Sequence, residues 1–454
     1  MKKKSKTYPK TYRGAQTAKA IKNFPFSFRS PQREFIYAIV EIKKSAALGH
    51  FLAGELSRER KQAIVKTCDE ILAGKYLSSF VLPAFQGGAG TSNHMNVNEV
   101  VAVRATEILA KTNNKTGKNK ITVHANDHVN MSHSTNDVMP SALRISAIRM
   151  TDKLLSTLDI LIKAFEKKSK QFAHVKKLGR THMQDAVPIT LGQEFSAYAE
   201  YIKRGRERIK HAREPMLELN LGGSAVGNSI NASPKYRAKL YQQLKKTTEL
   251  PFRPARNLMA GTSSNSDFVA LSQSLTAVCV DLSKIANDFR LLSSGPKGGL
   301  GEIVLPTLQP GSSIMPGKVN PILPEAINQL YFLVSGNNLT IEHAAEASQL
   351  ELGVMLPVIT DRLLESLKLM DELLSVFAKK CVEGIRANPK RCNELLENSL
   401  AYATLLTPEI GYDNAAMAVK HALATGKTLR QVVIEKKLLT IQKFDQLTKR
   451  LSFK

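Results

Sequence analysis

The sequence has no tryptophan, and its four cysteines are scattered along the chain. Cys68, Cys279, Cys381 and Cys392 include no pair with CxxC spacing, which argues against a zinc site and against a disulfide framework. We therefore expect reduced, buried thiols in a cytoplasmic protein.

Long apolar runs are also missing. No stretch of 18 or more apolar residues exists, so the sequence predicts no transmembrane helix. The N-terminal stretch MKKKSKTYPK is basic but has no apolar segment behind it, which argues against a secretory signal. These features predict a cytoplasmic protein without a membrane partner.

Acidic residues are few: 39 Asp and Glu stand against 65 Lys and Arg, which gives a formal net charge of +26. Much of the excess lies at the ends, because residues 1–30 hold nine basic residues and residues 427–454 hold eight. Such charge can steer anionic substrates or bind polyanions without specificity. Aromatic residues make up only 6% of the chain, and no zinc-finger or RNA-binding motif is present. We expect a solvated basic surface, and nonspecific polyanion binding is an additional property that this charge leaves open.

The hydrophobic pattern predicts a mainly α protein. Near the N-terminus, Ser30 and Pro31 predict a helix start with Ser30 as the N-cap. Uninterrupted helical patterns cover approximately residues 139–172, 190–219, 264–294, 324–350 and 357–384. Their broad apolar stripes lack a strict heptad, which favours a long-helix bundle. Because the helical segments shorten from about Pro389, we predict an N-terminal mostly helical domain (1–130), a central bundle domain (131–385) and a small helical C-terminal domain (386–454).

Four polar islands lie between the predicted helices: GGAGTSNHMNVNE (87–99), NDHVNMSHSTND (126–137), GRTHMQDAVP (179–188) and PGSSIMPGKVNPILPE (310–325). Each combines hydroxyl or amide side chains with a predicted helix boundary. A helix N-terminus offers free backbone N–H groups and a positive dipole end, which favour carboxylates. Ser, Thr and Asn side chains add donors and acceptors, and Arg180 and Lys318 add positive charge.

Taken singly, each island is typical of helix caps and turns. Long antiparallel helices, however, bring distant loops to a common end of a bundle. The combination therefore predicts a site for a small dicarboxylate. The islands contain no GxxxxGK[ST] phosphate loop and no Rossmann fingerprint, and the spacing of His124 and His128 is poor for a metal, so we expect no metal ion.

The stretch GSSIMPGKVNP (311–321) resembles the signature of the fumarase/aspartase superfamily, and its PGKVNP ending is similar to the class II fumarase and aspartase branch. The other islands match the family in sequence and in order, from about Tyr12 to near the C-terminus. The resemblance implies a mainly helical, three-domain fold with a central five-helix bundle. It also implies a homotetramer with a twenty-helix core, active sites shared between three subunits, and no organic cofactor.

The resemblance also implies a reaction, which is a reversible anti-elimination that yields fumarate. Ser312 matches the general base, on a loop whose Gly311 and Gly317 allow it to close over the substrate. The substrate carboxylate on which charge builds would be held by Thr91, Ser134, Thr135 and Ser313, and the other carboxylate by Thr181, His182, Lys318 and Asn320. Asn136 matches a ligand of the leaving group, and Glu325 matches the acid that pairs with His182.

The two activities of this branch differ in the leaving group, which is ammonia from L-aspartate or water from L-malate. Thr135 in SHSTND matches the aspartases, whereas class II fumarases usually have a second serine there. The segments HAAEASQLELGVMLPV (343–358), RLLSSGPKGGLGEIVLP and NFPFS also resemble aspartases. The resemblance therefore favours elimination of ammonia from L-aspartate, with the fumarate hydratase reaction as the alternative. A noncatalytic protein on this scaffold is a third interpretation, which the intact site positions argue against.

Some positions depart from the family pattern. His94 stands where the family usually has Asn, and His133 stands where a Gln commonly precedes STND. Gly353 replaces a usual Asn, and GNSIN (227–231) replaces GTGLN. Because His94 and His133 lie in the polar islands, we hypothesise that they shift the pH optimum.

Overall fold

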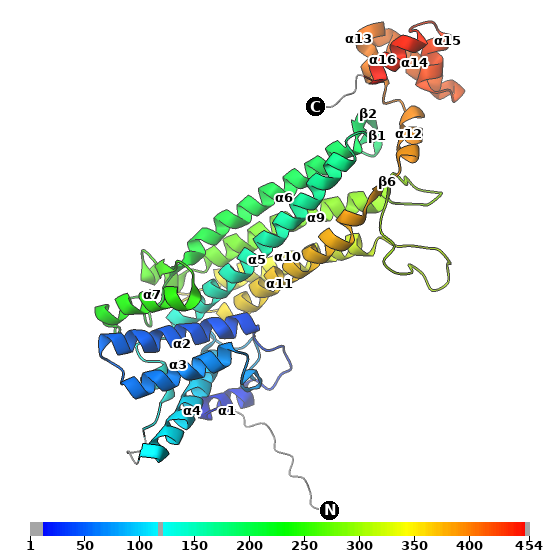
Figure 1. Cartoon of the computed structure of the whole chain (residues 1–454). Helices are drawn as coiled ribbons and strands as arrows, with labels where there is room; N and C mark the ends of the chain where they lie inside the picture. Colours follow the sequence, from blue (N-terminus) through cyan, green and yellow to red (C-terminus); the bar gives the residue numbers. More distant parts are fainter. Residues whose placement is uncertain (1–11, 117–120, 450–454) are drawn as a thin grey trace, which may run out of the picture. The chain divides into compact units, whose positions relative to one another are not determined.

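The computed structural model describes residues 12–116 and 121–449, and these residues are mainly helical, as the sequence predicts (Figure 1). Parts of the predicted basic surface, residues 1–11 and 450–454, lie outside the described residues. The chain divides into two compact units. Unit 1 comprises Met1–Leu154, Arg208–Thr276 and Leu333–Leu369, and unit 2 comprises Leu155–Glu207, Ala277–Phe332 and Met370–Lys454. The three predicted domains follow the linear order of the chain and stay a prediction.

Unit 1 contains short and medium helices besides parts of the long ones. Its own helices are α1 (Ala15–Asn23), α2 (Arg33–Ala53), α3 (Arg58–Leu72), α4 (Thr91–Thr116), α7 (Pro234–Thr248) and α8 (Leu258–Ser263). This unit also contains three short helical turns: η1 (Leu77–Ser79), η2 (Ala125–Val129), which is a π-helix, and η3 (Glu214–Leu217). Strands β3 (Glu218–Leu219) and β4 (Arg253–Pro254) pair in parallel. Local sequence explains several boundaries. The Ser57 side chain caps α3, and the Ser233 side chain caps α7 with Pro234 at its first position.

The predicted N-cap Ser30 is wrong. Helix α2 begins at Arg33, and its N-cap residue Gln32 makes no side-chain capping bond. The backbone N–H of Phe35 donates to the Gln32 carbonyl at 3.0 Å, so the first turn closes beyond Pro31. The residue before a proline is biased towards extended backbone, and here the extended conformation continues to Gln32 (ψ 143°).

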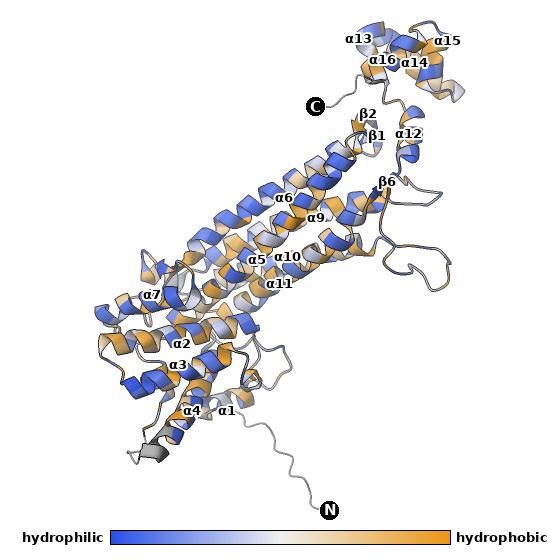
Figure 2. Cartoon of the chain, in the orientation of Figure 1, coloured by the Kyte–Doolittle hydropathy of each residue, from blue (hydrophilic) through white to orange (hydrophobic). Residues whose placement is uncertain are grey.

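The predicted bundle is present as five long helices that each contribute residues to both units: α5 (Thr135–Gln171), α6 (Leu191–Arg213), α9 (Ser266–Leu292), α10 (Ile322–Glu346) and α11 (Leu356–Lys380). In unit 1, Arg144 on α5 forms a 2.7 Å ion pair with Asp267 on α9. Hydrophobic and hydrophilic residues alternate along each long helix (Figure 2), as expected of amphipathic bundle helices.

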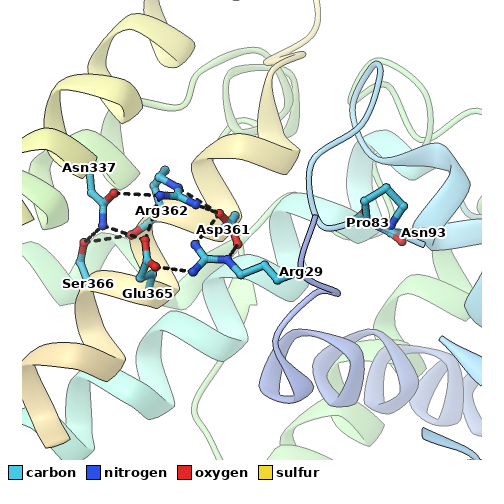
Figure 3. A network of polar contacts seen from close by, with 8 residues as sticks. All are labelled: Arg29, Pro83, Asn93, Asn337, Asp361, Arg362, Glu365 and Ser366. Carbon is cyan, nitrogen blue, oxygen red and sulfur yellow. Dashed lines mark hydrogen bonds and ion pairs between the residues drawn. The ribbon is translucent and has the colours of Figure 1, made fainter. Parts of the chain in front are cut away.

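A polar network in unit 1 connects the chain segment before α2 to α11 (Figure 3). The Arg29 guanidinium holds the Asp361 carboxylate with bonds of 2.6 and 2.7 Å and also pairs with Glu365. The Asn337 side chain on α10 donates to Ser366 on α11 at 3.1 Å. These contacts fix the two bundle helices in this unit against the segment that precedes α2.

The core of unit 2 is aromatic. Phe289 on α9 lies 5.6 Å from Phe195 on α6, 6.4 Å from Phe165 on α5 and 6.1 Å from Phe377 on α11, measured between ring centroids. Such ring pairs add to the stabilisation that burial of the rings provides. The Asn328 side chain attaches α10 to the same core, because its amide donates to Ser283 Oγ on α9 at 2.8 Å.

The C-terminal part of unit 2 has its own small hydrophobic core. Its elements are η4 (Val382–Gly384), β6 (Arg386–Ala387), α12 (Pro389–Glu397), α13 (Ala403–Ile410), α14 (Tyr412–Thr425), α15 (Leu429–Glu435) and α16 (Ile441–Lys449), and β6 pairs antiparallel with β5 (Ile303–Val304). Buried Leu396, Tyr402, Leu406, Val433 and Phe444 pack together. This core joins the short helices that follow the bundle.

Within the described residues, α9 alone is long and apolar enough to cross a membrane, judged by length and composition. Of its apolar window, 56% is buried inside the protein. That burial is typical of a core helix in a bundle.

Candidate active site

The first polar island forms the N-terminus of α4. The backbone N–H of His94 donates to the Gly90 carbonyl at 3.1 Å, so the first turn of α4 closes at Gly90. The island is anchored by Asn93, whose side chain donates to the Pro83 carbonyl at 3.2 Å (Figure 3). Thr91 is exposed at the first helical position. Its hydroxyl therefore lies beside backbone N–H groups that have no partner within the helix.

The second island forms the N-terminus of α5. Ser134 Oγ accepts from the Asn136 backbone N–H at 3.2 Å, and Asp137 Oδ1 accepts from the Ser134 N–H at 2.9 Å, which makes a reciprocal cap. Asp137 Oδ2 also accepts from the N–H groups of Gly222 (2.9 Å) and Ser224 (3.1 Å). Burial raises the pKa of Asp137 to about 6, while these backbone N–H bonds act in the opposite direction. Asp137 thus fixes the start of α5 against the segment around Gly222.

The two helix N-termini meet through His94 and Thr135. His94 Nδ1 lies 3.0 Å from Thr135 Oγ1, and the imidazole is 1% exposed. Burial, reinforced by the positive charge of Lys43, lowers the pKa of His94 well below 6.5, so the ring is neutral. Asn136, next to Thr135, donates its side-chain N–H to the Ala225 carbonyl at 2.8 Å. Unit 1 therefore brings together the first and second islands, as the sequence predicts.

A buried lysine lies behind the second island. Lys43 on α2 places Nζ 2.7 Å from Asn130 Oδ1 and 3.1 Å from His133 Nδ1, and His133 Nε2 lies 2.7 Å from the Tyr236 hydroxyl. Burial lowers the pKa of Lys43 to about 7, and burial together with the Lys43 charge lowers the pKa of His133 well below 6.5. Low pKa values of both His94 and His133 oppose the hypothesis that these rings set the pH optimum by their own titration.

The burial of Lys43 is hard to foresee from the sequence. Its only sequence signal is a charged residue within the apolar pattern of EIKKSAAL (41–48), where two neighbouring lysines cannot both face solvent on a buried helix. Helix α2 is buried along most of its length, and Lys43 is 1% exposed.

The third island does not lie at a helix start, which corrects that part of the sequence prediction. It forms a hairpin of β1 (Lys176–Thr181) and β2 (Gln184–Thr190), with Thr181 opposite Gln184. His182 (φ 53°) and Met183 (φ 62°) make the two-residue turn, whose positive φ angles suit the twist of a hairpin. Neither turn residue is Gly, Asn or Asp, so the usual sequence signal is absent. Thr181 and His182 are exposed at the hairpin tip.

A buried ion cluster holds this hairpin in unit 2. The Glu302 carboxylate is fully buried and lies 3.0 Å from Arg180 and 3.1 Å from Lys177. Lys177 also pairs with Glu194 at 2.9 Å. The Glu302 carbonyl accepts from the Asn388 N–H at 2.9 Å. Since Lys177 and Arg180 both lie on β1 and Arg180 directly precedes Thr181, the cluster holds β1 up to the turn that contains His182.

The fourth island is a closed, exposed loop. The Gly311 N–H donates to the Lys318 carbonyl at 2.8 Å, and the Asn320 side chain donates to the Gly311 carbonyl at 2.8 Å. Gly317 has a φ of 77° at the far side of the loop, a conformation that favours glycine. Lys318 is exposed and forms no ion pair with any of the described residues. Its positive charge is therefore available to an anionic ligand.

Ser312 is held within this loop by backbone groups. Its Oγ accepts from the N–H of Ile314 at 3.2 Å and from the N–H of Met315 at 3.1 Å. Donors that point at an oxygen favour its deprotonated form. An ordinary serine hydroxyl is a poor base, and these two donors act in the direction that a base would need.

A pocket of about 780 Å³ opens beside the loop in unit 2. Its lining includes Gly317 and Asn320 from the loop, Glu325 from α10, and Arg290 and Asn388. Within the part of the chain that the structure describes, no hydrogen bond or ion pair joins His182 to Glu325, so their pairing stays a prediction. The same residues contain no group of three or more His, Cys, Asp or Glu side chains that could hold a metal ion.

The predicted site residues of one chain therefore form separate groups. Unit 1 contains Thr91, Ser134, Thr135 and Asn136, and unit 2 contains Thr181, His182, Ser312, Ser313, Lys318, Asn320 and Glu325. Each group combines neutral donors with a helix N-terminus, a hairpin tip or a loop, which suits recognition of carboxylates.

Comparison with known families and proteins finds matches over nearly the whole chain. The family described as Lyase matches residues 4–336, and the family described as Fumarase C C-terminus matches residues 403–451. The match to the first family includes all four polar islands.

Several individual relatives match nearly the whole chain. An aspartate ammonia-lyase from Bacillus sp is 43% identical over 443 residues, which cover 97% of this chain and 94% of the relative. An aspartate ammonia-lyase from Helicobacter pylori is 44% identical over 440 residues (96% and 93%). A class II fumarate hydratase from Helicobacter pylori is 41% identical over 436 residues (96% and 93%). A solved structure described as fumarate lyase:delta crystallin from Brucella melitensis is 42% identical, with a TM-score of 0.92 and coverage of 98% and 96%.

Proposed function

Because this chain belongs to the fumarase/aspartase superfamily of lyases, we propose that it is an aspartate ammonia-lyase, which eliminates ammonia from L-aspartate to give fumarate. Relatives of that name are 43–44% identical to it over nearly their full length. The observation that best supports this chemistry is the geometry of the Ser312 loop, in which Ser312 Oγ accepts hydrogen bonds from two backbone N–H groups. No organic cofactor is needed, because the reaction only moves a proton and breaks a C–N bond.

In the proposed mechanism, Ser312 Oγ takes the proton from the carbon next to the β-carboxylate of L-aspartate. The electron pair of that C–H bond moves into the β-carboxylate, which becomes a doubly charged, enediolate-type intermediate. The pair then returns to form the carbon–carbon double bond as the C–N bond breaks and ammonia leaves. Hydroxyl and backbone donors aimed at the β-carboxylate would stabilise the charge that develops there. We assign this role to Thr91, Ser134, Thr135 and Ser313.

The other carboxylate of the substrate needs a separate clamp. We assign it to Lys318 and Asn320 of the loop with Thr181 and His182 of the hairpin, with Glu325 as the partner of His182. Lys318 supplies the full positive charge, and Asn320 already fixes the loop through the Gly311 carbonyl. Asn136 is the proposed ligand of the ammonia that leaves. Two clamps of this kind select a dicarboxylate over a monocarboxylate.

We further propose a homotetramer with active sites shared between three subunits. Helix α10 supports this proposal, because Phe332 (64% exposed), Leu333 (56%) and Leu339 (54%) leave a large apolar face uncovered. Association of long helices would cover that face and complete a twenty-helix core. The four cysteines are free and buried, which suits a reducing compartment, and we propose a cytoplasmic location.

Fumarate hydratase is the second candidate. A class II fumarate hydratase is 41% identical to this chain, only slightly less than the aspartate ammonia-lyases. The two reactions share the base and both carboxylate clamps, so they differ only in the contacts of the leaving group.

The assay that separates the two candidates follows fumarate formation by absorbance near 240 nm, with purified protein given L-aspartate or L-malate in parallel. A rise with L-aspartate alone establishes the ammonia-lyase. A rise with L-malate alone establishes a hydratase and overturns the proposal. No rise in absorbance with either substrate overturns both candidates and points to a different dicarboxylate.

A further inference from the structure

The contact between His94 and Thr135 joins two helix N-termini at the same place. His94 belongs to the first turn of α4 and Thr135 to the first turn of α5. The imidazole is buried, whereas Thr135 is only partly buried, and the two side chains are separated by 3.0 Å. Among the described residues, Thr135 Oγ1 forms this hydrogen bond and no other side-chain bond. The histidine therefore controls which way the threonine hydroxyl can donate.

The tautomer of His94 decides whether Thr135 can donate its hydroxyl hydrogen to a ligand. If Nδ1 carries the hydrogen, it donates to Thr135 Oγ1, and the threonine keeps its own hydrogen for another acceptor. If Nε2 carries the hydrogen, Nδ1 accepts the threonine hydrogen, and the hydroxyl has nothing left to donate. The two tautomers thus give Thr135 opposite roles towards an anion.

The surroundings of Nε2 favour the first tautomer. Nε2 is buried and has no hydrogen-bond partner among the described residues. A buried N–H without an acceptor is costlier than a buried lone pair without a donor. Burial and the nearby Lys43 charge keep the ring neutral, so only one nitrogen carries a hydrogen. The hydrogen therefore belongs on Nδ1, facing Thr135.

We propose that His94 is a positioning residue, which donates Nδ1–H to Thr135 Oγ1 and so directs the Thr135 hydroxyl hydrogen to the β-carboxylate of the substrate. This inference rests on the proposed function, in which Thr135 contacts that carboxylate. His94 itself does not touch the substrate. Because Thr91 lies three residues before His94 on α4, the same contact fixes the spacing between the two threonines that bind the carboxylate.

An asparagine at this position, which the family pattern usually has, offers a side-chain N–H in place of Nδ1–H. A leucine has nearly the volume of histidine but no donor. The two substitutions therefore separate the hydrogen bond from simple packing. His174, which is exposed in the turn after α5, provides a matched histidine control.

The test is a double-mutant cycle of His94→Leu and Thr135→Val in the full-length protein, with His94→Asn as the rescue variant and His174→Leu as the control. Two quantities are measured for each variant: kcat/KM with L-aspartate, and the dissociation constant of succinate by calorimetry. Succinate is a dicarboxylate that cannot react, so its binding reports on Thr135 even if L-aspartate is not the substrate. Thermal unfolding of each variant checks that it is folded.

We expect His94→Leu to weaken succinate binding and kcat/KM by about tenfold, as for loss of one hydrogen bond to a charged group. The same substitution made in the Thr135→Val background should change either quantity less than twofold, and His94→Asn should stay within about threefold of wild type. Equal losses in both backgrounds, or no loss for His94→Leu, overturn the inference. If His94→Leu does not fold, a tenfold loss in His94→Asn with normal thermal unfolding also overturns it. Absence of fumarate from L-aspartate in wild type overturns the proposed function alone.

Discussion

Arg180 holds the completely buried carboxylate of Glu302 at 3.0 Å, one residue before the exposed tip of the β1–β2 hairpin begins. Lys177, from the same strand, holds the other side of that carboxylate at 3.1 Å. The hairpin that carries Thr181 and His182 is therefore held by charge along β1, and its tip is exposed. Such an arrangement lets this turn, which we propose binds the substrate, project from the protein without losing its position.

Glu302→Gln tests this arrangement. The substitution keeps the shape of the side chain but leaves Lys177 and Arg180 without their shared anion, so we expect a loss of about 3 kcal/mol in the free energy of unfolding. Glu435→Gln, which breaks an exposed pair with Lys427, should cost less than about 1 kcal/mol. Denaturant unfolding of both variants provides the measurement. Equal losses would show that the buried cluster does not hold the hairpin.

The geometry at three glycines predicts how strongly a Gly→Ala substitution at each of them lowers kcat. An added Cβ at Gly311 would lie 2.7 Å from the Asn320 N and 2.8 Å from the Lys318 carbonyl oxygen, which are backbone atoms that cannot move aside. A Cβ at Gly317 meets no atom within 4 Å but has to adopt a φ of 77°, and Gly298 has space without a positive φ.

We therefore expect Gly311→Ala to lower kcat by tenfold or more, because a misplaced base loses its alignment with the substrate. Gly317→Ala should lower kcat less, through about 1 kcal/mol of backbone strain. Gly298→Ala should leave it unchanged. Steady-state kinetics of the three variants measures these effects. An unaffected Gly311→Ala enzyme would mean that the loop conformation in which Gly311 bonds to Lys318 and Asn320 is not the active one.

Lys318 is the proposed positive charge of the second clamp. Lys318→Met keeps most of the aliphatic chain and removes the charge, so we expect KM for the dicarboxylate to rise by about tenfold to a hundredfold. Lys167→Met, on the exposed side of α5, is the control and should leave KM unchanged. KM is obtained from the rate of fumarate formation at varied substrate concentration. An unchanged KM in Lys318→Met would remove Lys318 from the site.

The buried Lys43 predicts a pH dependence of stability. Burial lowers its pKa from 10.5 to about 7 in the folded protein. Between these values the unfolded chain holds a proton that the folded chain has released, so stability rises as pH increases from 7 towards 10.5. The largest slope from one such group is about 1.4 kcal/mol per pH unit.

Lys43→Met removes the titrating group. The difference in the free energy of unfolding, wild type minus Lys43→Met, should therefore increase between pH 7 and pH 9. Lys44→Met, which replaces the partly exposed neighbour paired with Asp69, should show no such increase. Denaturant unfolding at three pH values measures both differences. Parallel pH profiles of wild type and Lys43→Met would contradict a lowered pKa.

The sequence was sufficient for the helical architecture because long amphipathic periods leave few alternatives. The five predicted bundle segments correspond to α5, α6, α9, α10 and α11, with ends that differ by only a few residues in most cases. The largest error lies at the end of α6, which stops at Arg213 where Pro215 interrupts the helical backbone. The helix start at Ser30 failed for a related reason, since local backbone around Pro31 overrides the capping preference.

The places of several candidate site residues in the fold were predictable from the sequence, and the contacts between distant segments were not. Thr91, Ser134 and Thr135 lie at helix N-termini as expected, because small hydroxyl residues before an apolar period favour that position. The bond from His94 to Thr135 and the buried Lys43 depend on the tertiary packing of α2, α4 and α5. The hairpin turn at His182 was missed because its residues are not the usual turn formers.

Ser312 is the proposed base that begins the elimination, and a comparison of wild type with Ser312→Ala decides whether it has this role. Fumarate formation from L-aspartate and succinate binding are measured on both proteins, with Ser264→Ala as an exposed serine control. We expect Ser312→Ala to lower kcat by about 10³-fold, since a positioned general base contributes about 10²- to 10⁴-fold, while succinate still binds. A Ser312→Ala protein that retains a rate within tenfold of wild type would show that Ser312 is not the base.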